Sequence, residues 1–237
     1  MNNLIAIRHG QSLWNKSRRF TGWADIDLTE QGKLEAKLAG KLIKELNIDF
    51  DAYFTSVQKR AINTLKLILE TIDKPNAKII KAWELNERHY GALTGLNKDE
   101  IIKKHGSKQV QIWRRSFSVC PPPMDSKHPY KKNPYTEIPE KKIPKSESLE
   151  STFERVIPYY KKNIEPLIHA KKNILISAHG NSLRALCKNL FSISKKNIID
   201  FEIPTGNPLL IRFKNDLKIK DCKYLDSKRA KKILFNI

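Results

Sequence analysis

The chain contains two short apolar runs that each lead into a His-Gly dipeptide, and this repetition constrains its fold more than any other feature. The first run, Leu4–Ile7, leads through an arginine into His9 and Gly10, and the second run, Ile174–Ala178, leads into His179. A short apolar run that is closed by a glycine turn is typical of a buried strand. If the two strands are parallel neighbours, both imidazoles face the crevice at the carboxyl ends of the sheet, where α/β proteins usually bind ligands.

The residues beside the two histidines favour phosphoryl chemistry. Arg8 precedes His9, and near neutral pH an imidazole is substantially unprotonated and nucleophilic. A guanidinium beside it can hold two phosphate oxygens at once. Gly180 follows His179 and opens a stretch with helical spacing, and the free N–H groups at the start of a helix favour anions. The sequence therefore predicts that both histidines belong to one pocket for a phosphorylated anion.

Strand patterns and helix patterns alternate along the chain, which favours an α/β fold with a mostly parallel central sheet flanked by helices. Thr29 is the predicted N-cap of a helix that runs to Leu46, in which a leucine recurs at every fourth position from Leu34. Ser56 is the predicted N-cap of the next helix, which carries Arg60 in its first turn. Further predicted strands lie at 53–55, 79–80 and 209–211, and further predicted helices lie at 149–168 and 183–191.

Two segments depart from this alternation. Residues 97–146 are rich in proline from position 121 onward, and we predict that they form an insertion that acts as a lid. Residues 214–237 are charged, and we predict a mobile C-terminal tail that ends in an apolar patch at 233–235. With 237 residues and 40% hydrophobic composition, the chain can bury one sizeable core, so we expect a single domain over residues 1–237.

Several blocks of the sequence resemble the cofactor-dependent phosphoglycerate mutases of the histidine phosphatase superfamily, in the order of that family and at nearly its spacing. The blocks are residues 8–15, 20–23, 85–93, 113–115 and 178–185, within a match that runs from about residue 3 to about residue 213. The resemblance implies interconversion of 3-phosphoglycerate and 2-phosphoglycerate in glycolysis and gluconeogenesis. It also implies that 2,3-bisphosphoglycerate primes the enzyme and that no metal is required.

The resemblance implies chemical roles for five residues. His9 is the implied nucleophile, which forms a phosphohistidine, while Arg8 and Arg60 clamp the transferring phosphoryl group. His179 is implied to stabilise negative charge in the transition state, and Glu87 to act as general acid and base. From the residues alone, Arg60 could equally lie on a solvated helix face, and Glu87 could equally form a salt bridge.

The resemblance also implies residues that bind the phosphate and carboxylate groups of the substrate. They are Ser12, Asn15, Thr21, Gly22, Arg88, His89, Tyr90, Lys98, Arg114, Arg115, Gly180 and Asn181. Adjacent residues on a helix do not share a face, so one of the two arginines Arg114 and Arg115 could serve the structure instead. The chain departs from the family pattern in two places. Gln11 replaces a common glutamate, and the segment 124–149 is shorter than in typical members of the family and is rich in lysine.

The composition bears on partners and location. The formal net charge of +20 raises the possibility of nucleic-acid binding, but no nucleic-acid motif accompanies the charge, so we expect small phosphoglycerates as partners. The chain has no signal-peptide pattern and no run of about 20 apolar residues, so we expect no membrane association. Three cysteines without metal-ligand spacing favour the cytoplasm. The resemblance implies a homodimer or homotetramer.

Two other functions remain open from the sequence. A phosphatase on the same scaffold would also form a phosphohistidine, but water would then reach it. The insertion at 97–146 and the block Trp113-Arg114-Arg115 favour the mutase, because they resemble a lid that holds a carboxylate-bearing substrate. A binding protein without catalytic activity is disfavoured, because the residues implied in catalysis are all present.

Overall fold

The two strands that lead into His-Gly are neighbours in the sheet, as predicted. In the computed structural model, which describes residues 2–231 and 233, β1 (Asn2–Arg8) pairs in parallel with β4 (Ile174–Ala178). Arg8 lies opposite Ala178 in this pairing, so the two strands end at the same level. The residues that follow them, His9 and His179, therefore leave the sheet side by side.

Six strands form one sheet in the described part of the chain, in the order β3-β2-β4-β1-β5-β6. The other four strands are β2 (Ala52–Thr55), β3 (Ile79–Lys81), β5 (Leu209–Phe213) and β6 (Ile219–Tyr224). The first four strands in this order run parallel, whereas β5 and β6 add an antiparallel edge. The predicted α/β class and mostly parallel sheet are confirmed.

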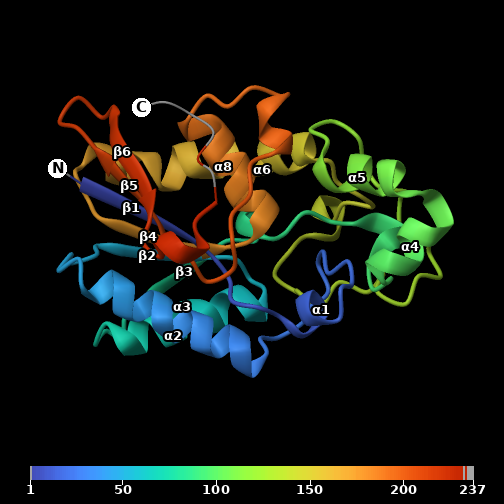
Figure 1. Cartoon of the computed structure of the whole chain (residues 1–237), viewed down its shortest axis with the longest axis horizontal. Helices are drawn as coiled ribbons and strands as arrows, with labels where there is room; N and C mark the ends of the chain where they lie inside the picture. Colours follow the sequence, from blue (N-terminus) through green and yellow to red (C-terminus); the bar gives the residue numbers. More distant parts are fainter. Residues whose placement is uncertain (1, 232, 234–237) are drawn as a thin grey trace.

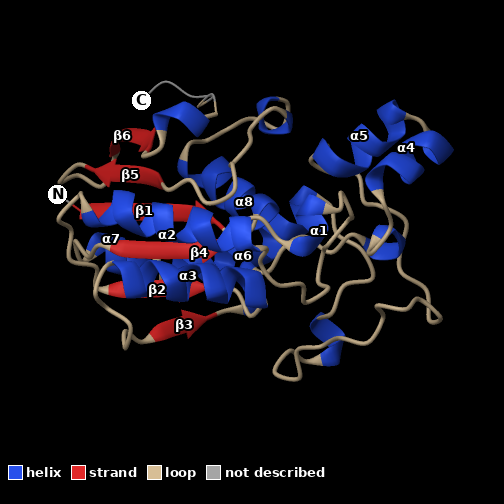
Figure 2. Cartoon of the chain, turned by 60° about the horizontal axis from the view of Figure 1, so that its bottom comes forward, coloured by secondary structure: helices blue, strands red, loops and turns tan. Residues whose placement is uncertain are grey.

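Helices cover both faces of this sheet. One face carries α2 (Glu30–Lys44) and α3 (Lys59–Thr71), and the other carries α6 (Leu149–Asn163), α7 (Glu165–His169) and α8 (Gly180–Leu190) (Figures 1 and 2). Successive side chains of a strand point to opposite faces, so the apolar residues of β1 divide between two cores. Ile5 and Ile7 pack with α2 and α3, and Leu4 and Ala6 pack with α6 and α8.

The helix α2 begins after Thr29 as predicted, because the Thr29 hydroxyl accepts a hydrogen bond from the backbone of Gly32. Its buried face, however, is not the leucine face. Leu34 and Leu38 are 60% and 42% exposed, whereas the buried residues are glycines and alanines together with Ile43. A Cβ atom on Gly40 would lie only 2.5 Å from Thr71 of α3. Small residues thus let α2 approach α3 closely, and this packing outweighs the spacing of the leucines.

The start of α3 differs from the prediction. Its N-cap is Gln58, and Ser56 lies before the helix rather than capping it. The Ser56 hydroxyl instead lies 2.7 Å from Nε2 of His179. A residue that was expected to begin a helix therefore contacts one of the two histidines.

The insertion contains two short helices, α4 (Lys98–His105) and α5 (Ser107–Arg115), followed by a largely irregular segment to residue 148. Together with the single turn α1 (Leu13–Lys16), these helices lie beyond the carboxyl ends of the strands (Figures 1 and 2). The helices α4 and α5 pack on a small cluster of Phe20, Leu93, Ile101 and Val110, which is separate from the two cores of the sheet. The role of residues 97–146 as a lid stays a prediction.

The predicted mobile tail from residue 214 is wrong over much of its length. Residues 219–224 form β6, an edge strand beside β5, and Arg229 donates hydrogen bonds to the carbonyls of Thr205 and Gly206. Ile233 packs against the core, while residues 234 and 235 of the predicted apolar patch lie outside the described residues. Over the residues that the structure describes, no helix is both long and apolar enough to cross a membrane.

The three cysteines occupy different environments. Cys120 is exposed at the end of the insertion helices, Cys187 is buried within α8, and Cys222 is half-buried on β6. Burial raises the pKa of the Cys187 thiol well above its ordinary value and that of Cys222 to about 12. The prediction that Cys187 is a small buried hydrophobe is confirmed.

Candidate active site

His9 lies directly after β1 and is fixed by its backbone and its ring. Its amide donates to the Ala178 carbonyl at 3.0 Å, and the Gly10 amide donates to the Thr64 hydroxyl at 3.1 Å. The ring nitrogen Nδ1 lies 2.7 Å from the Gly10 carbonyl oxygen. Because a carbonyl can only accept a hydrogen bond, this contact places the proton on Nδ1. Nε2 then keeps its lone pair, which is what a nucleophile needs.

The surroundings of His9 favour the neutral imidazole. Burial lowers the pKa of His9 well below 6.5, and the positive charges of Arg60 and Arg8 lower it further. Both effects penalise a cationic ring. At neutral pH the Nε2 lone pair of His9 is therefore available.

His179 lies beside His9, with ring centroids 5.0 Å apart. The Ser56 hydroxyl accepts from the Gln58 amide at 3.2 Å and lies 2.7 Å from His179 Nε2. If the Ser56 proton is donated to Nε2, the proton of His179 resides on Nδ1. Nδ1 is buried and has no hydrogen-bond partner among the described residues. Burial, then Arg60 and His9, hold the pKa of His179 well below 6.5, so this ring is also neutral.

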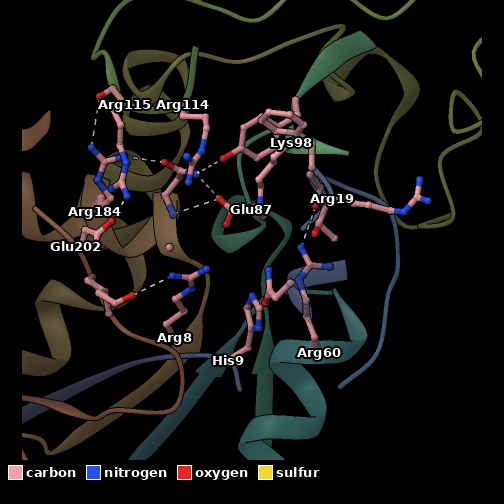
Figure 3. A pocket seen from close by; sticks show the side chains of 18 residues that line it. Arg8, His9, Arg19, Arg60, Glu87, Lys98, Arg114, Arg115, Arg184 and Glu202 are labelled. Carbon is pink, nitrogen blue, oxygen red and sulfur yellow. Dashed lines mark hydrogen bonds and ion pairs between the residues drawn. The ribbon is translucent and has the colours of Figure 1, made fainter. Parts of the chain in front are cut away.

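Two arginines flank the histidines. Arg60 is fully buried at the start of α3, and its guanidinium donates to the carbonyls of Ala24 and Gly22 at 3.0 and 2.9 Å. Arg8 donates through Nη1 to the Ile203 carbonyl, while its Nε is buried without a partner among the described residues. Figure 3 shows both guanidiniums on either side of His9. Fixed guanidiniums of this kind suit phosphate oxygens.

Glu87 approaches the same pocket from the segment after β3. Its Oε1 accepts from the Arg88 amide at 2.8 Å, and from the amide and side chain of Asn181 at 3.2 and 2.9 Å. Among the described residues, no hydrogen bond is made to its Oε2. One oxygen of the carboxylate is thus anchored, and the other carries no hydrogen bond from the described residues.

The pocket brings together thirteen of the residues predicted from the sequence. Those that line it are Arg8, His9, Asn15, Thr21, Gly22, Arg60, Glu87, Tyr90, Lys98, Arg114, Arg115, Gly180 and Asn181. Seven cationic side chains and two carboxylates face this space in the described structure, so its electrostatics favour an anion with several negative charges. Figure 3 shows Arg114 and Arg115 on the side of the pocket opposite to His9.

Four predicted site residues do not line the pocket. Ser12 caps α1, where its hydroxyl accepts from the Asn15 amide, and His179 lies beside His9 without being among the lining residues. The Arg88 guanidinium lies over the ring of Tyr90 at 4.7 Å, which makes it a support for a lining residue. His89 packs edge-on against Trp23 and accepts a hydrogen bond from the Gly91 amide. The expected ligand contacts of Ser12, Arg88 and His89 stay predictions.

The charges near Tyr90 act on its hydroxyl. Burial alone would raise the pKa of Tyr90, but the neighbouring guanidinium of Arg88, together with Arg114, lowers it to about 8. Lys98 lies over the ring of Phe20 at 5.8 Å, and burial lowers its pKa. Tyr90 and Lys98 thus line the part of the pocket that is formed by α4 and by the segment before it.

Sequence reasoning missed several residues of the pocket, namely Arg19, Phe20, Arg184, Glu202 and Ile203. Arg184 donates to Asn181 at 2.9 Å and to the Ile198 carbonyl, and burial, followed by the charge of Arg115, lowers its pKa to about 9. A signal for Arg184 was present, because it lies one helical turn after Gly180 in the second His-Gly block.

The two adjacent arginines both line the pocket, and the expectation that at least one of them serves the structure stays open. Arg115 forms an ion pair with Glu202, and Glu202 also lies 3.8 Å from Lys231 in the C-terminal segment. Nothing in the sequence pointed to Glu202, because it belongs to an irregular loop before β5. Among the described residues, no group of three or more His, Cys, Asp and Glu side chains is placed to hold a metal ion.

The open α/β sheet, with paired histidines at the ends of adjacent strands, defines the class of protein. A model of the histidine phosphatase superfamily (branch 1) matches residues 4–220. Solved structures share this fold at low sequence identity. A mycobacterial hydrolase superposes with a TM-score of 0.70 at 18% identity over 94% of this chain and 97% of its own. A mycobacterial glucosyl-3-phosphoglycerate phosphatase gives a TM-score of 0.68 at 19% identity, over 94% and 97%.

Curated relatives are much more similar. The 2,3-bisphosphoglycerate-dependent phosphoglycerate mutase of Pelagibacter ubique is 52% identical over 99% of both chains. The protein of the same name from Buchnera aphidicola subsp. Cinara cedri is 52% identical over 94% of this chain and 98% of its own. This chain belongs to the histidine phosphatase superfamily and, within it, to the family of 2,3-bisphosphoglycerate-dependent phosphoglycerate mutases.

Proposed function

We propose that this protein interconverts 3-phosphoglycerate and 2-phosphoglycerate through a phosphohistidine on His9. The observation that carries the proposal is the neutral imidazole of His9, with its Nε2 lone pair, in a pocket that also contains Glu87 and seven cationic side chains. A nucleophile, a carboxylate for proton transfer and an anion-binding wall are what a phosphoglycerate mutase requires. Phosphoglycerate turnover in the cytoplasm, by a homodimer or homotetramer, remains part of this proposal.

The residues of the pocket fit a ligand with two phosphate groups and one carboxylate. Arg8 lines the pocket and its Nε is buried without a partner among the described residues, so a phosphoryl group bound there would satisfy it. Lys98, Arg114 and Arg115 lie on the far side, where a second anionic group would bind. When 2,3-bisphosphoglycerate is bound there, it supplies the phosphoryl group that primes His9.

The chemistry follows from the two fixed side chains. His9 Nε2 attacks the phosphorus atom, so that a P–N bond forms as the ester P–O bond breaks, and Glu87 gives a proton to the leaving alkoxide oxygen. In the reverse step, Glu87 accepts the proton of a substrate hydroxyl while that oxygen takes the phosphoryl group from His9. Attack alternately by the 2-hydroxyl and the 3-hydroxyl oxygen interconverts the two phosphoglycerates. The Gly10 carbonyl holds the proton on His9 Nδ1 throughout.

A coupled assay through enolase tests the proposal. We expect conversion of 3-phosphoglycerate to 2-phosphoglycerate that trace 2,3-bisphosphoglycerate stimulates, and a loss of about 10⁴-fold or more in His9→Ala, because the nucleophile is removed. Pretreatment with a chelator should leave the activity unchanged. Phosphate release that needs His9 but proceeds faster than interconversion would show a phosphatase instead.

A further inference from the structure

Arg155 of α6 lies behind the segment that carries Glu87 and binds three of its backbone carbonyls. Its Nη1 donates to the carbonyls of Glu84 and Asn86 at 2.6 and 3.1 Å, and its Nη2 donates to the Glu87 carbonyl at 3.0 Å. Neither Arg155 nor its carboxylate partner Glu147 lines the pocket. A single guanidinium thus holds three of the four residues at 84–87 without approaching the ligand.

Glu147 fixes the orientation of this guanidinium. Its two oxygens accept from Nε and Nη2 of Arg155 at 2.7 and 2.9 Å, and one of them also accepts from the His89 amide at 2.8 Å. The two side chains are only 9% and 4% exposed. The planar fork of an arginine can meet a carboxylate and several carbonyls at once, whereas a lysine ammonium cannot keep this geometry.

The segment is also held from its other side. Trp23 Nε1 donates to the Glu87 carbonyl at 2.6 Å, and the Glu87 amide donates to the Gln58 side chain at 2.8 Å. The peptide groups on both sides of Glu87 are therefore fixed, while the carboxylate is anchored through Oε1 by Asn181. Of these supports, Arg155 holds the largest part of the segment.

We propose that Arg155, oriented by Glu147, is a positioning residue for Glu87 in the proton transfer to and from the substrate oxygen. The inference rests on the proposed function and deepens it, because it assigns a role to two residues outside the pocket. A catalytic group must be held within about 0.5 Å of its productive position. A displacement of about 1 Å costs on the order of 10²-fold in rate.

The first test measures single-turnover phosphorylation of His9 by 2,3-bisphosphoglycerate in Arg155→Lys and Arg155→Met. We expect a rate about 10- to 100-fold lower than in the native protein, with little change in the ligand concentration that gives half the maximal rate. Arg155→Lys keeps the positive charge beside Glu147 and remains measurable if Arg155→Met does not fold. Arg212→Met, which removes an arginine paired with Asp221 on the sheet edge, is the matched control and should keep the native rate.

A double-mutant cycle separates positioning from general loss of structure. If Arg155 acts through Glu87, Arg155→Lys should slow the native protein but not the Glu87→Gln variant. Equal slowing in both backgrounds would overturn the inference and leave the proposed function intact. A native rate in Glu87→Gln alone would instead remove the role of Glu87 from the proposed function, and the inference with it.

Acetyl phosphate provides a second readout, because its leaving group is acetate, a stable anion that needs no proton. His9 Nε2 again forms the P–N bond, the anhydride P–O bond breaks, and the electron pair leaves with acetate. We expect Arg155→Lys to phosphorylate His9 from acetyl phosphate within about threefold of the native rate, as judged by intact mass. If this donor slows as much as 2,3-bisphosphoglycerate does, Arg155 has only a structural role.

Discussion

The two sides of the pocket are built differently. His9 and His179 are buried directly after strands of the central sheet, and Arg60 is buried in the first turn of α3. Their positions therefore depend on strand pairing and on the packing of the main cores. Lys98 and Arg114 belong to the insertion helices, are half-buried, and depend on the separate cluster around Phe20. Under the proposed function, the sheet side forms and breaks the bonds, and the insertion side recognises the rest of the ligand.

The largest expected effect is on the sheet side. His179→Ala removes the imidazole beside His9 that we expect to stabilise the phosphoryl group, and kcat should fall by about 10²- to 10³-fold in the enolase-coupled assay. Ser56→Ala is the graded control, because it removes only the partner of His179 Nε2 and should cost less. An unchanged kcat in His179→Ala would show that the sheet side is not where the chemistry occurs.

Acid should destabilise the fold, because protonation of buried histidines such as His89 is unfavourable in the folded state. Burial lowers the pKa of His89 from 6.5 to about 4, so this ring stabilises the fold fully above pH 6.5 and loses that contribution as the pH falls toward 4. The loss amounts to about 3 kcal/mol. Urea unfolding at several pH values should show this decrease, and His89→Gln should flatten it. An equal slope in the variant would contradict the prediction.

A smaller effect is expected on the insertion side. Arg114→Ala should raise KM for 3-phosphoglycerate about 10-fold, because one charge-assisted contact is lost, while kcat changes little. Steady-state kinetics with the coupled assay measure both parameters. A large fall in kcat with constant KM would contradict the prediction that the insertion side contributes to binding rather than to the chemical step.

The smallest effect concerns the C-terminal segment. Lys231 is exposed and lies 3.8 Å from Glu202, and exposed ion pairs contribute little. Lys231→Met should therefore leave KM and kcat within about twofold of the native values. A change of KM as large as that in Arg114→Ala would place the C-terminal segment with the insertion side.

The sheet side could largely be predicted from the sequence. The apolar runs before His9 and His179 are short and sharply bounded, so periodicity was sufficient to place both residues at strand ends. The strand β6 was missed because an edge strand with one buried residue, Tyr224, carries no apolar alternation. The buried face of α2 was misjudged because packing against α3 selects small residues such as Gly40, which a search for leucines does not detect.

Supporting residues of the site were the least predictable. Gln58 and Arg155 act on Glu87 through backbone atoms, and Glu202 meets Arg115 from a loop far along the chain. Such contacts depend on the path of the backbone in three dimensions and leave no pattern in the local sequence. In the sequence, Arg155 looks like any other charged residue of an amphipathic helix.

The different surroundings of the three cysteines allow the insertion side to be labelled selectively. A cysteine reacts with a thiol-reactive dye through its thiolate, which attacks the dye, and burial raises the pKa values of Cys187 and Cys222. Cys120, which is exposed just after α5, is the thiol left accessible. The unmodified protein can therefore carry a fluorophore within the insertion, so that movement of this side can be followed during ligand binding while the sheet side stays unlabelled.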